Sequence, residues 1–290
     1  MKACLRRSAL YVPGDSERML QRSAGISSDM LLFNLEDGVA SSQKASARKN
    51  IVDALRSINF GDREIVIRTN PLNSEVGLND IADIVPLRPD GICLPKVEKV
   101  QEIFVAESAI REVEIRHGLP EGSTMLHAMV ESAAGILNSA QIAAASTRMS
   151  SLIFGSADYA SDVHCMPGED RFELMLALQF IVASARSAGI DALDAPCFDF
   201  RNRDLLYREA TQARRLGFAG KSAIHPDQLA IINQIFDVTP EEVAWAERAI
   251  AELDSAEHRG KALSTIDGKL IDNPHRAAAE RILSRRKPPL

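Results

Sequence analysis

The amino-acid sequence predicts a single (β/α)8 barrel followed by a C-terminal extension. Eight short apolar runs recur within the first 224 residues, and longer amphipathic stretches lie between most of them. Several runs are apolar at every position, as expected for parallel strands that are covered on both faces. A doubly wound sheet is the alternative fold, but no G-x-G-x-x-G motif follows the first run.

Strands and helices are expected to alternate along most of the chain. Strands are predicted over residues 8–12, 29–35, 64–69, 91–94, 125–130, 151–154, 191–195 and 218–224, of which 191–195 is the weakest. Helices are predicted over residues 16–24, 41–57, 97–117, 135–146, 169–189 and 202–217. Gly25, Gly189 and Gly217 fall where helices are expected to end.

The chain continues beyond the predicted barrel. Thr239 and Pro240 are typical of a helix start, and they open a predicted helix over residues 239–257. Asp267-Gly268 then predicts a hairpin turn, and Asn273-Pro274 opens a last helix that reaches residue 286. We expect a catalytic barrel over residues 1–254, and an extension over residues 255–290 that covers a site or reaches a neighbouring subunit.

Composition excludes several classes of partner. The net charge is −6, and no basic run with interleaved aromatic residues is present, so nucleic acid is not an expected partner. No apolar run approaches the roughly 20 residues of a membrane span. The cysteines have no metal-binding or redox spacing, which favours a reduced cytoplasmic location; they are Cys4, Cys93, Cys165 and Cys197.

Two acids follow predicted strands and are candidate metal ligands. Glu131 comes directly after the run 125–130, and Asp158 follows the run 151–154. Functional residues of such barrels lie at the carboxyl ends of strands, and these two strands are neighbours in the predicted order. Two carboxylates without nearby Cys or His ligands suit Mg²⁺, and the remaining coordination positions suit a chelating 2-oxo acid. The alternative is that both acids are helix N-caps or ordinary surface acids.

Arg68 ends an otherwise apolar strand, where an unpaired guanidinium would be costly. It is expected either to pair with Glu36 or Asp37, or to present its planar group to a substrate carboxylate or a developing enolate. Glu36 and Asp37 are expected either to support this site, by orienting Arg68 or metal-bound water, or to cap the following helix.

Other polar residues receive weaker predictions. Arg18, Arg22 and Lys44 lie in or near the first turns of the first two helices, where they either hold phosphates or form solvated faces. Lys96 is expected to be a salt-bridged lysine rather than a Schiff base, and no Ser has an adjacent His–acid arrangement. Two histidines are expected to be structural, His225 in a loop and His127 in the core or behind the site.

Eight segments of the sequence carry a resemblance to a known family. They run in order from residue 7 to about residue 274, and they are RSALYVPGDSERMLQRS, LEDGVASSQKASAR, IRTNPLNSEVGLND, PDGICLPKVE, VESAAGILN, FGSADYASDV, LGFAGKSAIHPDQL and DGKLIDNP. On these segments the chain resembles the citrate lyase β-subunit-like family of the HpcH/HpaI aldolase group, and in particular its stand-alone citramalyl-CoA and malyl-CoA lyases. Members are (β/α)8 barrels that usually assemble as trimers or multiples of trimers.

The resemblance implies roles for individual residues. Glu131 and Asp158 match the Glu and Asp that bind Mg²⁺ in the family, and no organic prosthetic group is implied. Arg68 matches the Arg that engages the substrate near the reacting centre, and the acids of segment 36–37 match acids that support the site. Asp272 matches an Asp that acyl-CoA lyase members contribute from the neighbouring subunit.

The basic residues Arg18 and Arg22 lie where such members meet the phosphates of coenzyme A, and Lys44 is added as a candidate for the same role. The sequence departs from the family at three places: Asn34 stands where an Asp is frequent, Ala157 where an acid is frequent, and VHC over residues 163–165 where LG is common. These departures bear on substrate identity rather than on reaction type.

We therefore expect a Mg²⁺-dependent carbon–carbon lyase that cleaves a 3-hydroxyacyl-CoA into acetyl-CoA and a 2-oxo acid. The substrate is expected to be citramalyl-CoA, with malyl-CoA and citryl-CoA as alternatives, and the enzyme is expected to be a homotrimer or hexamer. Two alternatives are the β subunit of a citrate lyase complex that acts on a citryl thioester of a carrier protein, and a non-catalytic barrel that binds CoA or an oxo acid. A class II aldolase of the pyruvate type is disfavoured because no His clearly supplies the acid–base role.

Overall fold

The computed structural model describes residues 5–258 and 260–285, and they form two compact units. The first unit ends at Phe236 and the second begins at Asp237. The expected boundary after residue 254 falls inside helix α10 (Pro240–His258), so the units divide one helix earlier than the sequence analysis placed it. Cys4 and the last five residues of the expected extension lie outside the described residues.

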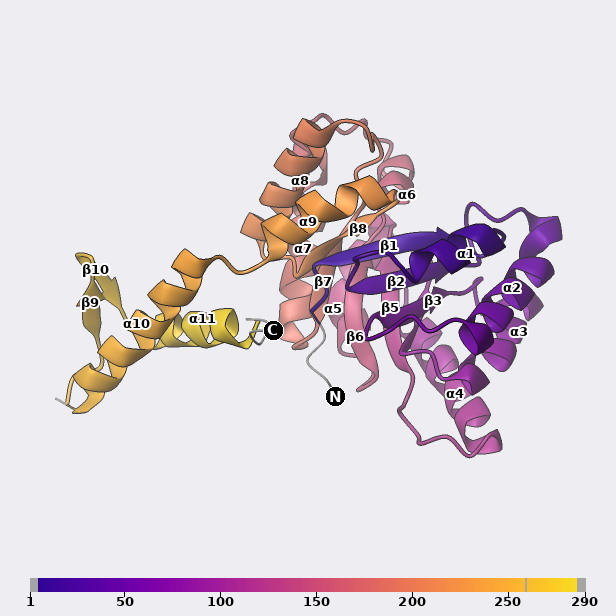
Figure 1. The fold of residues 1–290 in the computed structure, drawn as a ribbon, viewed down its shortest axis with the longest axis horizontal. Helices are drawn as coiled ribbons and strands as arrows, with labels where there is room; N and C mark the ends of the chain where they lie inside the picture. The colour runs from indigo at the N-terminus through magenta and orange to yellow at the C-terminus, as the bar shows by residue number, and fades with distance from the viewer. Residues whose placement is uncertain (1–4, 259, 286–290) are drawn as a thin grey trace. The chain divides into compact units, whose positions relative to one another are not determined.

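The first unit is a closed parallel barrel in which each strand pairs with its neighbours in sequence order, and β8 pairs with β1 (Figure 1). All eight predicted strands are present, with β4 and β5 at the predicted bounds. The strands are β1 (Ser8–Pro13), β2 (Met30–Asn34), β3 (Glu64–Arg68), β4 (Gly91–Leu94), β5 (Met125–Val130), β6 (Met149–Phe154), β7 (Asp191–Asp194) and β8 (Gly220–Ala223). The predicted (β/α)8 barrel is therefore confirmed.

Nine helices accompany these strands within the described part of the first unit. They are α1 (Glu17–Ser23), α2 (Lys44–Ser57), α3 (Glu75–Ile84), α4 (Val100–Arg116), α5 (Ala133–Ala143), α6 (Ser156–Asp162), α7 (Met175–Ser187), α8 (Arg203–Leu216) and α9 (Leu229–Phe236). The sequence analysis did not predict α3, α6 or α9, which are all ten residues or shorter. In α3 the main-chain N–H of Gly77 donates to the Oγ of Ser74, the residue that caps the helix, at 3.2 Å. A Cβ at Gly77 would lie 2.4 Å from the Pro71 carbonyl oxygen, so glycine is needed for this helix to pack against its own loop.

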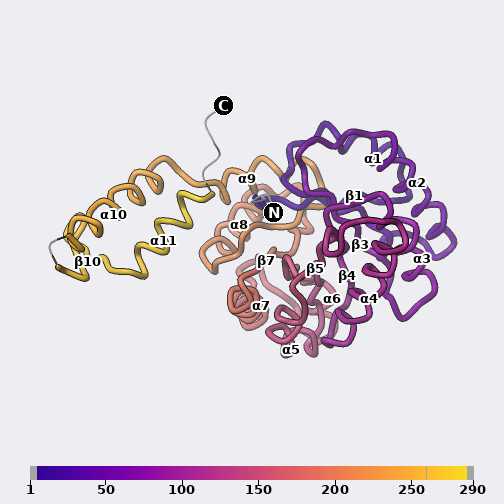
Figure 2. The backbone as a smooth tube through the Cα atoms, turned by 90° about the horizontal axis from the view of Figure 1, so that it is seen from below, coloured from indigo at the N-terminus to yellow at the C-terminus, as the bar shows by residue number. Residues whose placement is uncertain are grey.

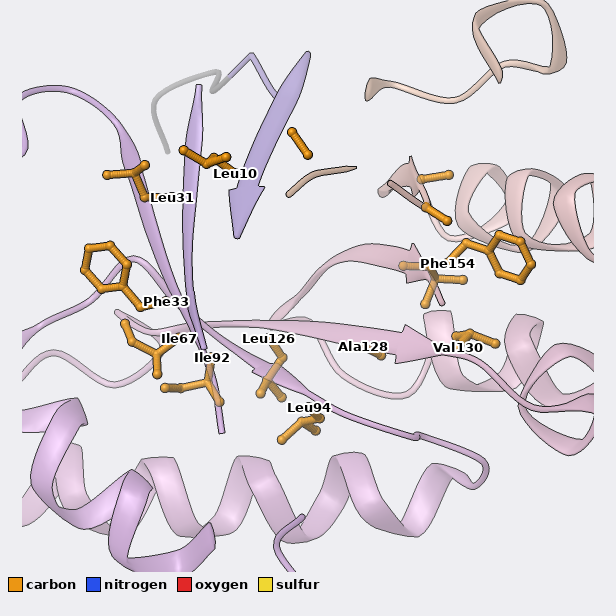
Figure 3. Packing of buried hydrophobic residues seen from close by; sticks show 14 of the residues in the cluster. Leu10, Leu31, Phe33, Ile67, Ile92, Leu94, Leu126, Ala128, Val130 and Phe154 are labelled. Atoms are coloured by element: carbon orange, nitrogen blue, oxygen red, sulfur yellow. The ribbon is translucent and has the colours of Figure 1, made fainter. Parts of the chain in front are cut away.

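The alternation of side chains along each strand divides the apolar core into two layers. One set faces the helices, where Figure 3 shows Ile92, Leu94 and Leu126 on the helix side of their strands. The other set fills the barrel interior with Ala9, Leu32, Val66, Cys93, Ile153 and Leu193. The interior is therefore a packed core, and polar side chains gather only at its two ends.

Ionic contacts close the amino-terminal end of the barrel. Arg6 donates to both carboxylate oxygens of Glu64, at 2.7 and 2.6 Å, and also to Asp191 at 3.1 Å. His127 lies beside them, fully buried, with its Nδ1 2.7 Å from the Ser151 hydroxyl, and burial followed by the charge of Arg6 lowers its pKa. The prediction of a structural role for His127 is confirmed.

A buried charge cluster supports the carboxyl end of β7. Asp194 and Lys221 are both fully buried, and the Lys221 Nζ donates to Asp194 at 2.8 Å and to the Ala195 carbonyl at 2.6 Å. Arg171 donates to both oxygens of Asp194, and Glu209 lies 2.9 Å from the Lys221 Nζ. The charges of the two cations and the two acids balance. The hydrogen bond from Lys221 to the Ala195 carbonyl holds the main chain where β7 enters the following loop.

The second unit consists of α10, a hairpin of β9 (Ser264–Ile266) and β10 (Lys269–Ile271), and α11 (Asn273–Ser284). α10 and α11 lie side by side around a small apolar cluster that includes Leu253, Ile266 and Ile271 (Figure 2). The hairpin turn has φ values of 49° at Asp267 and 75° at Gly268, as the Asp-Gly pair predicts. Thr239 caps α10 as predicted, because its Oγ1 accepts from the Glu242 N–H at 3.2 Å. No helix among the described residues is long and apolar enough to span a membrane.

Replacement of Asp194 tests the buried charge cluster. We expect Asp194→Ala to lower the free energy of unfolding by about 3–5 kcal/mol, because it leaves two buried cations short of a counter-charge. Arg111→Ala is the matched control, since it removes one partner of the exposed Arg111–Glu121 pair, which is 2.8 Å long. The control is expected to cost less than about 1 kcal/mol in urea unfolding. Equal losses for the two variants would contradict this account of the cluster.

Candidate active site

A cavity of about 590 Å³ opens at the carboxyl ends of the barrel strands. The charged side chains that line it are Arg22, Asp37, Arg68, Glu131 and Asp158. Four of these five come from loops or strand ends that follow four different strands, which is the arrangement that barrel enzymes use for catalysis. The structure therefore brings most of the predicted site residues to one place.

Glu131 is the first residue after β5 and is buried. Its Oε1 accepts from the main-chain N–H of Lys96 at 2.8 Å. Its Oε2 lies against Gly155, where an added Cβ would be only 2.2 Å away. Gly155 is therefore required for the Glu131 carboxylate to take this position.

Asp158 follows β6, as expected from the sequence. It lies in the first turn of α6 rather than at the strand end itself. Its side chain is exposed and lines the same cavity as Glu131. Burial, followed by the charge of Asp158, raises the pKa of Glu131 to about 7. Two neighbouring carboxylates with a surplus of negative charge are the arrangement that a divalent cation stabilises.

The donor set fits Mg²⁺ better than a softer metal. Mg²⁺ commonly takes one or two protein carboxylates and completes its shell with water and substrate oxygens. No group of three or more His, Cys, Asp or Glu side chains suited to a metal exists among residues 5–258 and 260–285. Glu131 and Asp158 are carboxylates of this cavity that could hold a divalent ion together with oxygens of a ligand.

Arg68 ends β3 inside the barrel and is 8% exposed. Its Nη1 lies 3.4 Å from Glu36 Oε2, so the structure shows the pairing with an acid that was one of the two alternatives, while a contact with substrate stays a prediction. Its guanidinium carbon also lies 5.2 Å from the centre of the Tyr11 ring, within the range of a cation–π contact. These contacts hold a permanent positive charge at the cavity wall.

Lys96 connects the acids of two loops. Its Nζ lies 3.2 Å from Glu36 Oε1 and 3.0 Å from Asp37 Oδ2, which confirms the predicted salt-bridged lysine. Burial raises the pKa of Asp37, but the hydrogen bond and charge of Lys96 outweigh this and lower it. Lys96 has a left-handed backbone with φ of 51°, and its N–H is the donor to Glu131. One residue therefore positions Glu131 through its main chain and the Glu36–Asp37 loop through its side chain.

The three basic residues expected at the coenzyme A phosphates differ in their surroundings. Arg22 lines the cavity from α1, whereas Arg18 on the same helix is exposed and does not line it. Lys44 donates to the carbonyls of Leu35 and Glu36, each at 2.8 Å, and burial lowers its pKa. Lys44 thus fixes the loop that carries Glu36, and a phosphate contact for it stays a prediction.

Two further predicted residues have local roles. His225 caps the short turn after β8, since its Nδ1 accepts from the Asp227 N–H at 3.2 Å, as predicted for a loop-bracing residue. Asp272 belongs to the second unit, where it precedes α11 and its Oδ1 lies 2.7 Å from His275 Nδ1. Asp272 is partly exposed, so its carboxylate is open to solvent.

Sequence reasoning missed three residues that line the cavity around Arg68, namely Tyr11, Met129 and Asn34. The Tyr11 hydroxyl contacts the Met129 sulfur at 3.5 Å, and both side chains face the barrel interior. The strands that carry Tyr11 and Met129 were predicted. Because alternate side chains of a strand share one face, the positions two residues before Pro13 and Glu131 could have been identified as facing the interior. Asn34 was noted only as a departure from a family pattern.

Known proteins resemble this chain over most of its length. The profile of the HpcH/HpaI aldolase/citrate lyase family matches residues 7–226, and a profile described as a C–C bond lyase of the TIM-barrel fold matches residues 176–288. The chain is 37% identical to the citrate lyase subunit beta of Haemophilus influenzae over 98% of this chain and 97% of that protein. It is 33% identical to a (3S)-malyl-CoA thioesterase of Cereibacter sphaeroides over 96% and 94% of the two chains.

A solved structure of CitE from Mycobacterium tuberculosis in complex with magnesium, acetoacetate and coenzyme A superposes with a TM-score of 0.78. It is 25% identical in sequence, and the match covers 98% of this chain and 99% of that chain. The family profile covers three quarters of this chain, and two curated relatives cover almost all of it. The chain therefore belongs to the HpcH/HpaI aldolase/citrate lyase family and is a carbon–carbon lyase.

Proposed function

We propose that this protein is a Mg²⁺-dependent lyase that cleaves a 3-hydroxyacyl-CoA into acetyl-CoA and a 2-oxo acid. The observation that carries the proposal is that Glu131, Asp158 and Arg68 line one cavity. The complex of the M. tuberculosis relative with magnesium, acetoacetate and coenzyme A supports it. Glu131 and Asp158 would hold the ion, which when bound supplies a Lewis acid and a template for the oxygens of the oxo-acid half.

Arg68 provides the charge that the reaction requires. When the bond between the second and third acyl carbons breaks, the 3-hydroxyl group gives up its proton to water in the cavity and becomes the ketone of the 2-oxo acid, while the electron pair of the broken bond forms the enolate of the thioester. A fixed guanidinium at the cavity wall stabilises that negative charge, and it does so without reorganisation because Tyr11 and the Glu36 loop already hold it. Glu36, Asp37 and Lys96 keep this loop in place.

The enolate carbon must then receive a proton to become the methyl group of acetyl-CoA. We assign this transfer to Asp272 of a neighbouring subunit, because its partly exposed carboxylate begins a helix in a unit separate from the barrel. The proposal therefore requires a homo-oligomer, a trimer or hexamer, in which each barrel receives the second unit of another copy.

The lining of the cavity favours citramalyl-CoA over its two alternatives. Most of the lining is apolar, with Leu10, Val12, Met19, Ile26, Phe154 and Ile224 among the side chains. The methyl group of the pyruvate half gains apolar contact there, whereas the second carboxylate of a citryl group would lose hydration. Malyl-CoA has a hydrogen at the carbon where citramalyl-CoA has this methyl group, so it would leave the apolar space beside that carbon unfilled. Arg22 at the cavity would meet a phosphate of coenzyme A.

A second candidate function follows from the 37% identity with the H. influenzae citrate lyase subunit beta. In that case the chain acts on a citryl thioester of a carrier protein, together with partner subunits. Affinity purification of the chain from its native cells distinguishes the two functions, because a lyase complex retains two partner subunits in fixed stoichiometry.

An acetyl-CoA release assay with the three thioesters tests the reaction. We expect citramalyl-CoA to be cleaved with a kcat/KM at least about tenfold above those of malyl-CoA and citryl-CoA, a difference of about 1.4 kcal/mol. EDTA is expected to abolish turnover, and added Mg²⁺ to restore it. Metal-independent turnover contradicts the mechanism. Release of a free hydroxy acid with CoA, in place of a 2-oxo acid with acetyl-CoA, contradicts the reaction.

Gly155→Ala tests the metal ligands without removing either carboxylate. Because the new Cβ would collide with the Glu131 carboxylate, we expect about 10–100-fold weaker Mn²⁺ or Mg²⁺ binding by calorimetry. Glu131→Gln should weaken binding at least as much. Gly168→Ala is the control, since a Cβ there meets its nearest atom, Asp170 Oδ1, at 3.4 Å, an ordinary contact. Unchanged affinity in both Glu131→Gln and Gly155→Ala would remove Glu131 from the site.

Mixed oligomers test whether Asp272 acts on another subunit's barrel. We expect Asp272→Asn and Glu131→Gln each to lower kcat by about 100-fold or more when alone. Co-expression of the two inactive chains should restore about one quarter of the wild-type activity, since sites that join an intact barrel to an intact Asp272 reappear. Two separately purified variants, mixed without subunit exchange, serve as the control. No recovery on co-expression would contradict catalysis across subunits.

A further inference from the structure

The two carboxylates that would hold the ion lie on separate segments of the chain. Glu131 follows β5, whereas Asp158 lies on α6, beyond the end of β6. The parallel pairing of β5 and β6 ends at Val130 and Phe154, and the Gly155 N–H adds one more bond to the Val130 carbonyl at 3.2 Å. This pairing places Glu131, but it stops before α6. It therefore does not by itself fix Asp158 relative to Glu131.

A third acid joins these two segments. Asp162 is the last residue of α6, four residues after Asp158, so both side chains lie on one face of the helix. Its Oδ2 accepts from the main-chain N–H of Ala133 at 2.7 Å. Ala133 is the first residue of α5 and comes two residues after Glu131. Asp162 therefore ties the helix that carries Asp158 to the segment that carries Glu131.

The bond between Asp162 and Ala133 is charge-assisted. The first N–H groups of a helix have no partner within it, and they lie at its positive end. In α5 the Gly135 N–H is bound by Ser132 Oγ at 3.1 Å, and the N–H of the first residue is bound by Asp162. An ionised carboxylate is a stronger acceptor than a neutral oxygen. The start of α5 is therefore held both by its own loop and by α6.

The loop after β5 is also fixed on its other side. The Lys96 N–H binds Glu131 Oε1 at 2.8 Å, and Ser132 Oγ donates to Glu98 Oε1 at 2.7 Å. Both partners belong to the loop after β4. Because these two bonds anchor the loop that carries Glu131, the bond at Asp162 determines where α6 lies against it.

Asp162 has no part in the core or in the cavity wall. Its side chain is exposed, and it does not line the cavity. The buried side of α6 is packed separately, since the centre of the Tyr159 ring lies 5.7 Å from that of Phe154. Exposed contacts of charged side chains contribute little to the free energy of unfolding. Loss of the Asp162 bond is therefore expected to move α6 rather than to unfold the barrel.

We propose that Asp162 positions the two metal ligands: its bond to Ala133 holds α6 against the start of α5 and so sets the separation of the two carboxylates. In this account Asp162 does not touch the ion and acts through α6. Contacts that orient metal ligands are worth about 10–100-fold in metal affinity. The inference rests on the proposed function for the presence of the ion, whereas the bond itself concerns this chain alone.

Two substitutions separate position from charge. Asp162→Ala removes the acceptor, whereas Asp162→Asn removes the charge but keeps an oxygen that accepts from the Ala133 N–H. We measure Mn²⁺ binding by calorimetry on the full chain after metal removal with EDTA. We expect Mn²⁺ to bind about tenfold more weakly to Asp162→Ala, and within about threefold of the wild type to Asp162→Asn.

Asp170→Ala is the matched control. Asp170 is also an exposed aspartate, and its Oδ1 accepts from the main-chain N–H of Phe172 at 3.1 Å. Its replacement removes the same charge and the same kind of bond, but that bond joins residues two apart in the chain and involves neither α5 nor α6. We expect its Mn²⁺ affinity to stay within about twofold of the wild type, and the thermal midpoints of all three variants to stay within about 3 °C.

Amide exchange tests the bond without metal or substrate. The Ala133 N–H should exchange slowly with solvent in the wild type, in Asp162→Asn and in Asp170→Ala. It should exchange at least about tenfold faster in Asp162→Ala. Unchanged exchange in Asp162→Ala overturns the inference.

The remaining outcomes separate this inference from the proposed function. If the wild type cleaves its thioester and Asp162→Ala binds Mn²⁺ as tightly as the wild type, the inference is wrong and the proposed function stands. If Asp162→Asn binds as weakly as Asp162→Ala, charge or direct ligation explains the loss and the positioning role is wrong. An equal loss in Asp170→Ala, or a midpoint that falls together with the affinity, also overturns it. If the wild type cleaves none of the three thioesters but the Mn²⁺ affinities follow the expected order, the proposed function fails and the inference stands. If the wild type binds no Mn²⁺, both are wrong.

Discussion

The site depends on keeping one permanent cation, Arg68, beside the apolar middle layer of the barrel interior. A buried guanidinium is tolerated only where hydrogen bonds and charge compensate for the lost hydration. The loop after β2 supplies both, through the side chains of Asn34 and Glu36 and the carbonyl of Asp37. Lys44 fixes the same loop from outside by binding two of its carbonyls. Much of the chemistry of this loop is thus explained by the need to hold a single side chain.

The metal half of the site is connected to the cation half through Lys96. Its main-chain N–H binds Glu131, while its ammonium binds Glu36 and Asp37. The left-handed backbone of Lys96 is what directs these two groups to different partners. A shift of the loop after β4 would therefore move Glu131 and also loosen the loop that holds Arg68. The proposed reaction relies on both side chains, so their positions are coupled through Lys96.

The sequence predicted the elements that depend on local patterns and missed those that depend on packing. The apolar runs, the Asp267-Gly268 turn and the Thr239 cap each have a local cause, and all are present in the structure. Helix α3 was missed because it is short and contains Gly77, and its place is set by contact with its own loop. Strand ends identified Arg68 and Glu131, whereas Asn34 required the register of β2 against β3. The domain boundary also depends on packing, because α10 is covered by α11 and the hairpin.

The barrel unit itself explains why proton transfer is assigned to the second unit. Among the described residues that line the cavity, each candidate acid or base already has another task. Asp37 is paired with Lys96, which lowers its pKa, and His225 caps a turn while its ring stacks on Phe200 at 4.8 Å. Burial raises the pKa of Tyr11 far above neutrality, so its hydroxyl does not lose its proton, and Glu131 and Asp158 are assigned to the ion. A barrel with a fixed cation and two carboxylate ligands, but no uncommitted acid–base group, needs one from elsewhere. The proposal gives this task to Asp272 of the second unit, whose side chain is partly exposed although it also contacts His275.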